Sequence, residues 1–545
     1  MTATFWCFMG QQTEERKNSM EDILTSVSTR KTPQNQKADK RQRKNAAGGF
    51  TFEVADVERL KRFLTLGSAS GTYYVGAAEL TRENAAVVMK MAEENHDLLV
   101  DTIVDVSTRG AAPKNDYALF ALAIAASQGS DEERRNALEH LHLVARTGTH
   151  LFTFATYIEQ FRGWGRSLRR AVGSWYTRKD AERVGYQTVK YRQRGGWTHR
   201  DLLRLAHPET SDESLKSLFE WITTGKMDGH LPRIVEGYVK AQEPYAKIPE
   251  LINRYNLSWE MLPTEALTRK DTWEALLQNG MPIGALIRNL PRLTNLGLIS
   301  PMSFWTGTIA KQLQDAQRLT KARVHPINVL NAQRTYSSGH SFRGDGSWKP
   351  VQDIVDALDA GFYASFGSVE PAGKRTMLAL DVSGSMGFST IGGMSLTPRE
   401  ASAALALVQA SVEPVRGIFG FTGYGQMDPL AISPRQRLDD AISTVSSLPF
   451  GPTDCALPPQ YAREHGMNVD TFVVYTDNET WSGRSHPHQE LERYRQASGI
   501  DAKMIVVGMT ATSSSIANPD DPGMLDVAGF DSGVPNLITE FSRGF

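Results

Sequence analysis

Five oxygen-bearing side chains, spread over three loops, have the types and positions of a cation site. Asp381, Ser383 and Ser385 follow directly after an apolar run and precede a helix-like segment. Thr453 and Asp477 lie in two later loops that we also expect to follow strands. Carboxylate and hydroxyl oxygens are hard ligands of the kind that Mg²⁺ takes, together with water. We therefore expect all five residues to hold one Mg²⁺ or another divalent cation.

The Asp-x-Ser-x-Ser sequence also has a structural explanation, because Asp and Ser often cap a helix by accepting backbone N–H bonds. The elements around it favour the cation. Short apolar runs alternate with helix-like stretches at 377–380, 418–421, 472–475 and 504–507. This pattern is typical of a parallel sheet covered by helices, whose ligands bind beyond the carboxyl ends of the strands. We predict an α/β doubly wound, Rossmann-like domain over residues 370–545.

A second chemistry is indicated by the charge distribution. Residues 376–545 contain 10 Lys and Arg against 19 Asp and Glu, whereas the preceding residues carry a basic excess. Within that basic part, residues 162–204 hold 12 Lys and Arg, three acidic residues and several Trp and Tyr. Clustered cations bind phosphates, and basic grooves lined with aromatic rings bind single strands. The candidate RNA-binding residues here are Arg162, Arg166, Arg169, Arg170, Lys190, Arg192, Arg194 and Arg200.

The region before the α/β domain has a helical pattern. Apolar residues recur three and four apart from residue 50 to about residue 366, as at Leu138, Leu141 and Val144. A helical region of this length without heptads favours stacked helix pairs over one bundle. The first 48 residues have few apolar anchors and many basic ones, so we predict a basic, disordered arm over residues 1–48 and a helical domain over residues 49–369.

Composition and missing motifs narrow the classes of function. The two cysteines, Cys7 and Cys455, leave no room for a disulfide framework or a four-cysteine zinc site. No stretch approaches the ~20 apolar residues of a membrane helix, so we expect a cytoplasmic protein without membrane contact. The sequence contains no phosphate loop, HExxH or GxSxG motif. We expect no enzymatic activity.

Several strings resemble one family. The five cation-site residues are similar to the metal-ion-dependent adhesion site of von Willebrand factor A domains. The longer strings 451–458, 475–480 and 507–510 resemble the A domain of the Ro ribonucleoprotein autoantigen. Upstream, strings similar to the TROVE module that precedes the A domain in Ro lie at 151–154, 164–166, 190–194, 196–204 and 323–326. The resemblance runs from about residue 49 to residue 545, in the same domain order.

This resemblance implies an all-α HEAT-like helical-repeat ring closed by a von Willebrand factor A domain. Ro proteins bind small Y RNAs on an outer basic face and single-stranded 3′ ends of misfolded noncoding RNAs in the hole of the ring. Bacterial relatives work with Y RNA and the exoribonuclease polynucleotide phosphorylase in RNA maturation, quality control and decay. For this chain the resemblance implies noncoding RNA, not DNA, as partner, a monomeric ring, and RNA contacts for His199, Arg323 and His325.

Two alternatives remain open from the residues. The basic segment could be a solvated charged face, although few acidic residues neutralise it, and a lone His199 would by itself favour a structural role. The protein could also be an interaction scaffold, in which the cation at Asp381, Ser383 and Ser385 captures a carboxylate of a partner protein.

Overall fold

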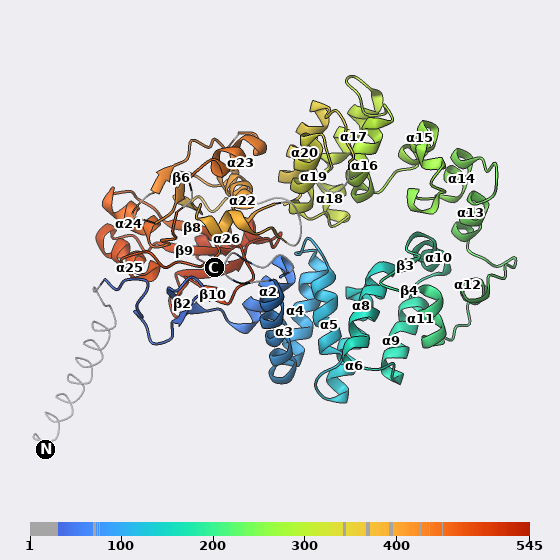
Figure 1. The fold of residues 1–545 in the computed structure, drawn as a ribbon, viewed down its shortest axis with the longest axis horizontal. Helices are drawn as coiled ribbons and strands as arrows, with labels where there is room; N and C mark the ends of the chain where they lie inside the picture. The colour runs from blue at the N-terminus through green and yellow to red at the C-terminus, as the bar shows by residue number, and fades with distance from the viewer. Residues whose placement is uncertain are drawn as a thin grey trace, which may run out of the picture.

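The computed structural model describes residues 31–544 apart from gaps at 69–71, 73–74, 76, 342–344, 367–370, 392–395, 424, 426, 435 and 450. Helices α2 to α20 form an arc, and both ends of the arc lie against an α/β domain, so the chain closes into a ring (Figure 1). The predicted fold class, a helical-repeat ring followed by a doubly wound domain, is confirmed. The predicted boundary at residues 369 and 370, and residues 1–30 of the predicted arm, lie outside the described residues.

The arc is built from short helices that pack on their neighbours in sequence. Their apolar sides form one continuous core, and polar caps define several of their ends. Helix α6, for example, begins with a capping box between Ser130 and Glu133. The helices are α2 (Asp56–Leu66), α3 (Ala77–Glu94), α4 (His96–Arg109), α5 (Asp116–Ala125), α6 (Asp131–Glu139), α7 (Leu141–Val144), α8 (Gly148–Phe161), α9 (Arg166–Thr177), α10 (Ala181–Lys190), α11 (His199–Ala206), α12 (Glu213–Thr224), α13 (Arg233–Ala241), α14 (Ile248–Tyr255), η1 (Trp259–Met261), η2 (Ala266–Thr268), α15 (Lys270–Gln278), α16 (Ile283–Asn295), α17 (Phe304–Leu313), α18 (Ala316–Lys321), α19 (Pro326–Ser338) and α20 (Gln352–Ala364).

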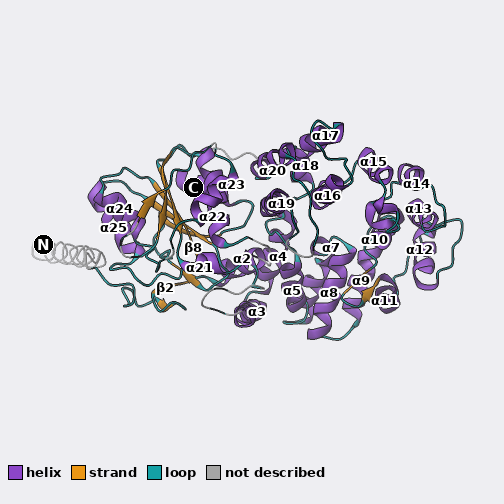
Figure 2. Cartoon of the chain, turned by 45° about the horizontal axis from the view of Figure 1, so that its top comes forward, coloured by secondary structure: helices purple, strands orange, loops and turns teal. Residues whose placement is uncertain are grey.

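The α/β domain contains a six-stranded sheet in the order β11-β9-β8-β5-β6-β7, parallel except for the edge strand β7. Figure 2 shows the strands around β8 at one end of the molecule, with the helical arc beside them. Its strands are β5 (Thr376–Asp381), β6 (Val415–Phe421), β7 (Met427–Pro429), β8 (Thr471–Thr476), β9 (Lys503–Gly508) and β11 (Met524–Ala528). Its helices are α21 (Gly384–Phe388), α22 (Pro398–Val412), α23 (Leu438–Ser446), α24 (Leu457–Glu464), α25 (Pro487–Ser498) and α26 (Val534–Arg543).

Alternate residues of the central strands serve two cores. Leu378 and Leu380 of β5 belong to the core that continues into the helical arc, whereas Met377 and Ala379 belong to a second core under α24 and α25. Strand β5 pairs with β6 on one side and β8 on the other, and all three run parallel. The order of the sheet therefore reverses at β5, which is where ligands of doubly wound sheets bind.

The prediction that the basic arm is disordered is wrong for residues 31–48. This segment and its continuation, here called the N-terminal strap (residues 31–54), lies against the α/β domain. Its strands β1 (Arg43–Lys44) and β2 (Phe50–Glu53) form a sheet with β10 (Ser514–Ser515). Composition suggested disorder because the strap is rich in Gln and Asn, yet Gln34, Gln42 and Asn45 are buried and their amides are hydrogen-bonded.

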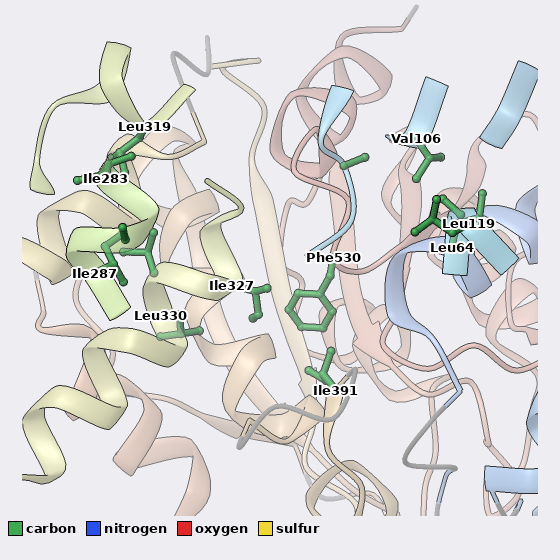
Figure 3. Packing of buried hydrophobic residues seen from close by; sticks show 14 of the residues in the cluster. Leu64, Val106, Leu119, Ile283, Ile287, Leu319, Ile327, Leu330, Ile391 and Phe530 are labelled. Atoms are coloured by element: carbon green, nitrogen blue, oxygen red, sulfur yellow. The ribbon is translucent and has the colours of Figure 1, made fainter. Parts of the chain in front are cut away.

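The ring closes where α19 begins. His325 is the N-cap of α19, and its Nδ1 accepts the N–H of Ile327 at 3.1 Å. Its Nε2 lies 3.0 Å from the carbonyl oxygen of Ala111, after α4, and 2.7 Å from that of Phe530, after β11. One imidazole thus joins the first helices of the arc, the last helices of the arc and the α/β domain. Phe530 lies among the apolar side chains of this junction, close to Ile327 (Figure 3).

The first helix of the arc is fixed to the α/β domain by a buried arginine. The guanidinium of Arg62 in α2 donates to the carbonyl oxygens of Thr512 and Ser514 and pairs with the carboxylate of Asp526 in β11. The Arg62 side chain is fully buried, so the α/β domain is a structural member of the ring. Arg109 and Asp531 add an exposed ion pair at the same junction, with 3.2 Å between nitrogen and oxygen.

Replacing His325 with Ala should lower the free energy of unfolding at pH 7.5 by about 2–4 kcal/mol, because buried backbone groups of three segments lose their partner. Urea denaturation followed by circular dichroism measures this loss. His230→Ala, at an exposed position, is the matched control and should stay within about 0.5 kcal/mol of wild type.

The loss caused by His325→Ala should also depend on pH. Burial lowers the pKa of His325 from 6.5 to about 4, against smaller opposing effects of the hydrogen bonds to the Phe530 and Ala111 carbonyls and of the Asp531 carboxylate. The unfolded chain binds a proton more readily, so the contribution of His325 is complete above pH 6.5 and shrinks as the pH falls toward 4. An equal loss at pH 7.5 and pH 5 would contradict a buried, neutral imidazole.

Candidate cation site and nucleic-acid interface

The five predicted cation ligands lie at the carboxyl end of the sheet, where its order reverses. Asp381 ends β5, Ser383 is the N-cap of α21, and Asp477 directly follows β8. All five, including Ser385 and Thr453, are buried. The helix-cap explanation of this sequence fails in one respect, because the Ser383 side chain makes no hydrogen bond that caps α21.

Direct contacts connect most of these side chains. One carboxylate oxygen of Asp381 accepts the N–H of Ser383 at 2.9 Å, and the other accepts the hydroxyl of Thr476 at 2.7 Å. The hydroxyl oxygens of Ser383 and Ser385 are 3.1 Å apart. Asp477 interacts with the Ser385 hydroxyl and with the charge of Asp381.

The electrostatics of the site favour a cation. Burial raises the pKa of Asp381, and burial together with the carboxylates of Asp381 and Glu479 raises that of Asp477 to about 8. The Oγ1 atom of Thr453 is buried and has no hydrogen-bond partner. Two buried carboxylates and an unpartnered hydroxyl form a donor set that suits a divalent cation with oxygen ligands. No group of three or more His, Cys, Asp and Glu in the described residues is placed to bind a metal, so this set depends on hydroxyls.

The N-terminal strap supports the loops that carry Thr453 and Asp477, which the sequence did not suggest. The Gln34 amide nitrogen donates to Asp454 Oδ1 at 2.7 Å and to the Ser485 carbonyl at 2.9 Å, while its oxygen accepts the Thr480 hydroxyl. The backbone N–H of Cys455 in turn donates to that same Thr480 hydroxyl at 3.0 Å. Gln34 therefore joins the residue after Thr453 to the loop that follows Asp477.

The basic segment places three of its arginines on one exposed face of α9. Arg166, Arg169 and Arg170 are exposed, while Leu168 and Trp175 on the other side are buried. Across the described ranges, the three guanidinium groups form no ion pair and no hydrogen bond. We call this surface the α9 face. Beside it, a cleft of about 360 Å³ is lined by Arg135, His142, Arg170 and Arg178, with Glu139 as its acidic residue.

A groove lies next to Arg192 and Arg200, both exposed. It measures about 450 Å³ and is also lined by Trp221 and Tyr238. The rings of Trp221 and Tyr238 are 6.5 Å apart, and Arg192 donates to the Tyr238 hydroxyl at 3.3 Å. The exposed Arg194 belongs to the adjacent hairpin β3 (Gln193–Arg194) and β4 (Trp197–Thr198). Neither aromatic residue was predicted from the sequence, because Trp221 and Tyr238 come from α12 and α13, outside the basic segment.

Two predicted RNA contacts, His199 and His325, are only 2% and 4% exposed. His199 Nδ1 is hydrogen-bonded to the hydroxyl of Tyr176 at 2.8 Å, and burial lowers the pKa of each imidazole to about 4. His199 nevertheless lines the groove of Arg192 and Arg200, so its contact with RNA stays a prediction. Both nitrogens of His325 are bonded within the protein, which gives this residue a structural role.

Of three further predicted contacts, two have partners within the protein and one is exposed. Arg162 donates to the carbonyl of Ala126 at 2.6 Å, after the end of α5. Lys190 donates to the Tyr186 hydroxyl at 2.8 Å and lies 3.7 Å from the carboxylate of Glu260, so its charge is already partnered. Arg323 is exposed.

The described helices include none that combines the length and the apolar composition needed to cross a membrane.

Comparison with known proteins agrees with this architecture. A family model described as TROVE domain matches residues 43–234 and 252–338, and one described as Ro60 vWA domain matches residues 375–542. The RNA-binding protein RO60 of Deinococcus radiodurans is 39% identical over 533 residues, which cover 96% of this chain and 100% of that protein. The RNA-binding protein RO60 of Caenorhabditis elegans is 34% identical over 582 residues, which cover 92% of this chain and 90% of that protein.

A solved structure shares the whole fold. The crystal structure of the Deinococcus radiodurans RO (RSR) protein matches with a TM-score of 0.68 at 39% identity, and the match covers 90% of this chain and 100% of that one. The resemblance predicted from sequence strings is thereby confirmed. The chain belongs to the Ro60 family, with a TROVE domain followed by a Ro60 von Willebrand factor A domain.

Proposed function

We propose that this protein is a non-catalytic, cytoplasmic RNA-binding protein that acts in RNA quality control, maturation or decay. The observation that carries the proposal is the α9 face, where Arg166, Arg169 and Arg170 are exposed without ionic partners. Phosphates are the natural partners of such unneutralised arginines. The curated relatives are themselves named RNA-binding proteins.

The RNA we propose has two parts. A structured noncoding RNA of the Y type binds the α9 face through its phosphates. A single-stranded 3′ end is bound by the ring, and the groove of Arg192, Arg200, Trp221 and Tyr238 has the basic and aromatic composition that single strands require. An exoribonuclease such as polynucleotide phosphorylase would receive the bound RNA. A ring closed within one chain fits a monomer.

Replacing Arg169 and Arg170 together with Ala should weaken binding of a labelled RNA hairpin and reduce the slope of log affinity against log salt by about two, because each lost phosphate contact removes about 0.9. Filter binding or fluorescence anisotropy across a salt series measures the affinity and the slope. Lys270→Ala with Lys311→Ala removes the same charge from exposed positions elsewhere and should leave the slope unchanged. An unchanged slope in the arginine variant would refute the assignment of the α9 face.

A hairpin with a single-stranded 3′ tail should bind more tightly than the same hairpin with a blunt end. The tail adds stacking and phosphate contacts, worth about 1–3 kcal/mol for each stacked base. Competition of the two RNAs for the wild-type protein gives the ratio of affinities. Equal affinity would remove single-stranded ends from the proposal.

The five predicted cation ligands are proposed to hold Mg²⁺ or another divalent cation. Four of them lie at or after the ends of β5 and β8, whereas Thr453 lies between α23 and α24, so the expectation that its loop follows a strand is wrong. Once bound, the cation would supply a Lewis-acidic position open to a carboxylate of a partner protein. One observation favours this second function, capture of a protein. Phe388, 67% exposed, and Trp481, 38% exposed, belong to the segments that carry the ligands, and exposed aromatic residues are common at protein interfaces.

Asp381→Asn should abolish Mn²⁺ binding measured by calorimetry and leave affinity for the RNA hairpin unchanged. Gln34→Ala should weaken Mn²⁺ binding about tenfold, because groups that orient ligands typically have effects of this size. Gln36→Ala changes an exposed glutamine of the same strap and is the control. Equal Mn²⁺ affinity for the Gln34 and Gln36 variants would show that the strap does not position the site.

A further inference from the structure

A cleft of about 550 Å³ lies where α10, α13 and α14 meet. Its lining includes Lys179, Arg183, Arg233, Arg254, Tyr186 and Tyr255. It shares no lining residue with the cleft beside the α9 face or with the groove of Arg192 and Arg200. None of its residues belongs to the RNA contacts predicted above. We call it the α10–α13 cleft.

The α10–α13 cleft has four cationic side chains and one acidic one, Glu182. That carboxylate is already committed, because its two oxygens accept the backbone N–H groups of Arg233 and Ile234 at the start of α13. Arg183 pairs with Asp180 at 3.2 Å, but this pair is exposed and such pairs contribute little. The other three cations, Lys179, Arg233 and Arg254, have no carboxylate partner within the described ranges.

Lys179 is the cation of this cleft whose surroundings are best defined. Its ammonium lies 3.6 Å from the ring centroid of Trp175 and donates to the Trp175 carbonyl at 3.0 Å. Burial, with no acidic partner to oppose it, lowers the pKa of Lys179 to about 8. A partly desolvated cation that has only a ring and a carbonyl as neighbours is stabilised when an anion binds beside it.

Two tyrosines, Tyr186 and Tyr255, complete the lining of the cleft. Their hydroxyls accept from Lys190 and Lys240, each at 2.8 Å. Guanidinium groups and an ammonium match the several acceptor oxygens of a phosphate better than the two of a carboxylate. The volume is in the range of nucleotide-sized sites.

We propose that the α10–α13 cleft is a phosphate-binding subsite for the RNA strand bound by the α9 face. The inference rests on the proposed function and adds a contact to it. The cleft follows the α9 face closely along the chain, since Lys179 comes two residues after the end of α9. This proximity favours RNA as the source of the phosphate. The subsite would hold the phosphates of one or two nucleotides and lengthen the path of the RNA from α9 toward α13.

The first test uses full-length Arg233→Gln with Arg254→Gln. Glutamine is shorter than arginine but keeps a polar, uncharged side chain, and the backbone N–H groups that donate to Glu182 stay in place. The salt slope for the tailed hairpin should fall by one to two relative to wild type, as expected for one or two lost phosphate contacts, while Lys270→Gln with Lys311→Gln should not change it. A cleft variant with the wild-type slope would overturn the proposal.

A second measurement needs no variant. Acetylation of Lys179 in the wild-type protein, followed by mass spectrometry, should be suppressed by the hairpin at the concentrations at which the hairpin binds. Acetylation of the exposed Lys270 and Lys311 should not be suppressed. Protection by free AMP or inorganic phosphate at concentrations where the hairpin gives none would assign the cleft to a small anion and overturn the RNA subsite.

The two proposals fail in different ways. If the Arg169 and Arg170 variant lowers the salt slope and the cleft variant does not, the cleft inference is wrong and the proposed function stands. If the wild-type protein binds the hairpin without salt dependence, the proposed function fails as a whole.

Discussion

The imidazole of His325 is bonded at both nitrogens, and these bonds hold together segments from three parts of the chain. Nδ1 starts helix α19, and Nε2 reaches the carbonyls of Ala111 and Phe530. A ring of short helices has no central core, so each helix is supported mainly by its neighbours. Closure makes the two ends of the arc neighbours through the α/β domain, and the rigidity of every surface along the arc depends on that closure.

The two domains carry the charges of the two proposed sites, acidic in the α/β domain and basic in the helical arc. The α/β domain carries the acidic excess and buries Asp381 and Asp477 together at one sheet edge. Within the helical arc, residues 162–204 carry 12 Lys and Arg against three acidic residues, and most of these cations are exposed. Opposite charges of the two domains meet at their junctions, as in the pairs of Arg62 with Asp526 and Arg109 with Asp531.

The clustering of the candidate cation ligands was predictable because most of its geometry follows from local rules. A strand, a tight turn and a helix place Asp381, Ser383 and Ser385 together, and parallel strands bring Asp477 to the same edge. The strap was not predictable, because the partners of Gln34 lie more than 400 residues away. A polar segment appears disordered when its hydrogen-bond partners cannot be inferred. His199 and His325 show the reverse problem, since a match to a family string does not indicate whether a side chain is exposed.

The N-terminal strap is synthesised before the α/β domain against which it lies. Gln34 is synthesised before its partners Asp454, Thr480 and Ser485, which follow 420 or more residues later. Until then the strap lacks the surface against which it lies in the folded protein. The strap can dock only after these loops have been made. Contacts of such sequence separation form slowly, so the nascent chain exposes an unfinished ring edge throughout translation of the α/β domain.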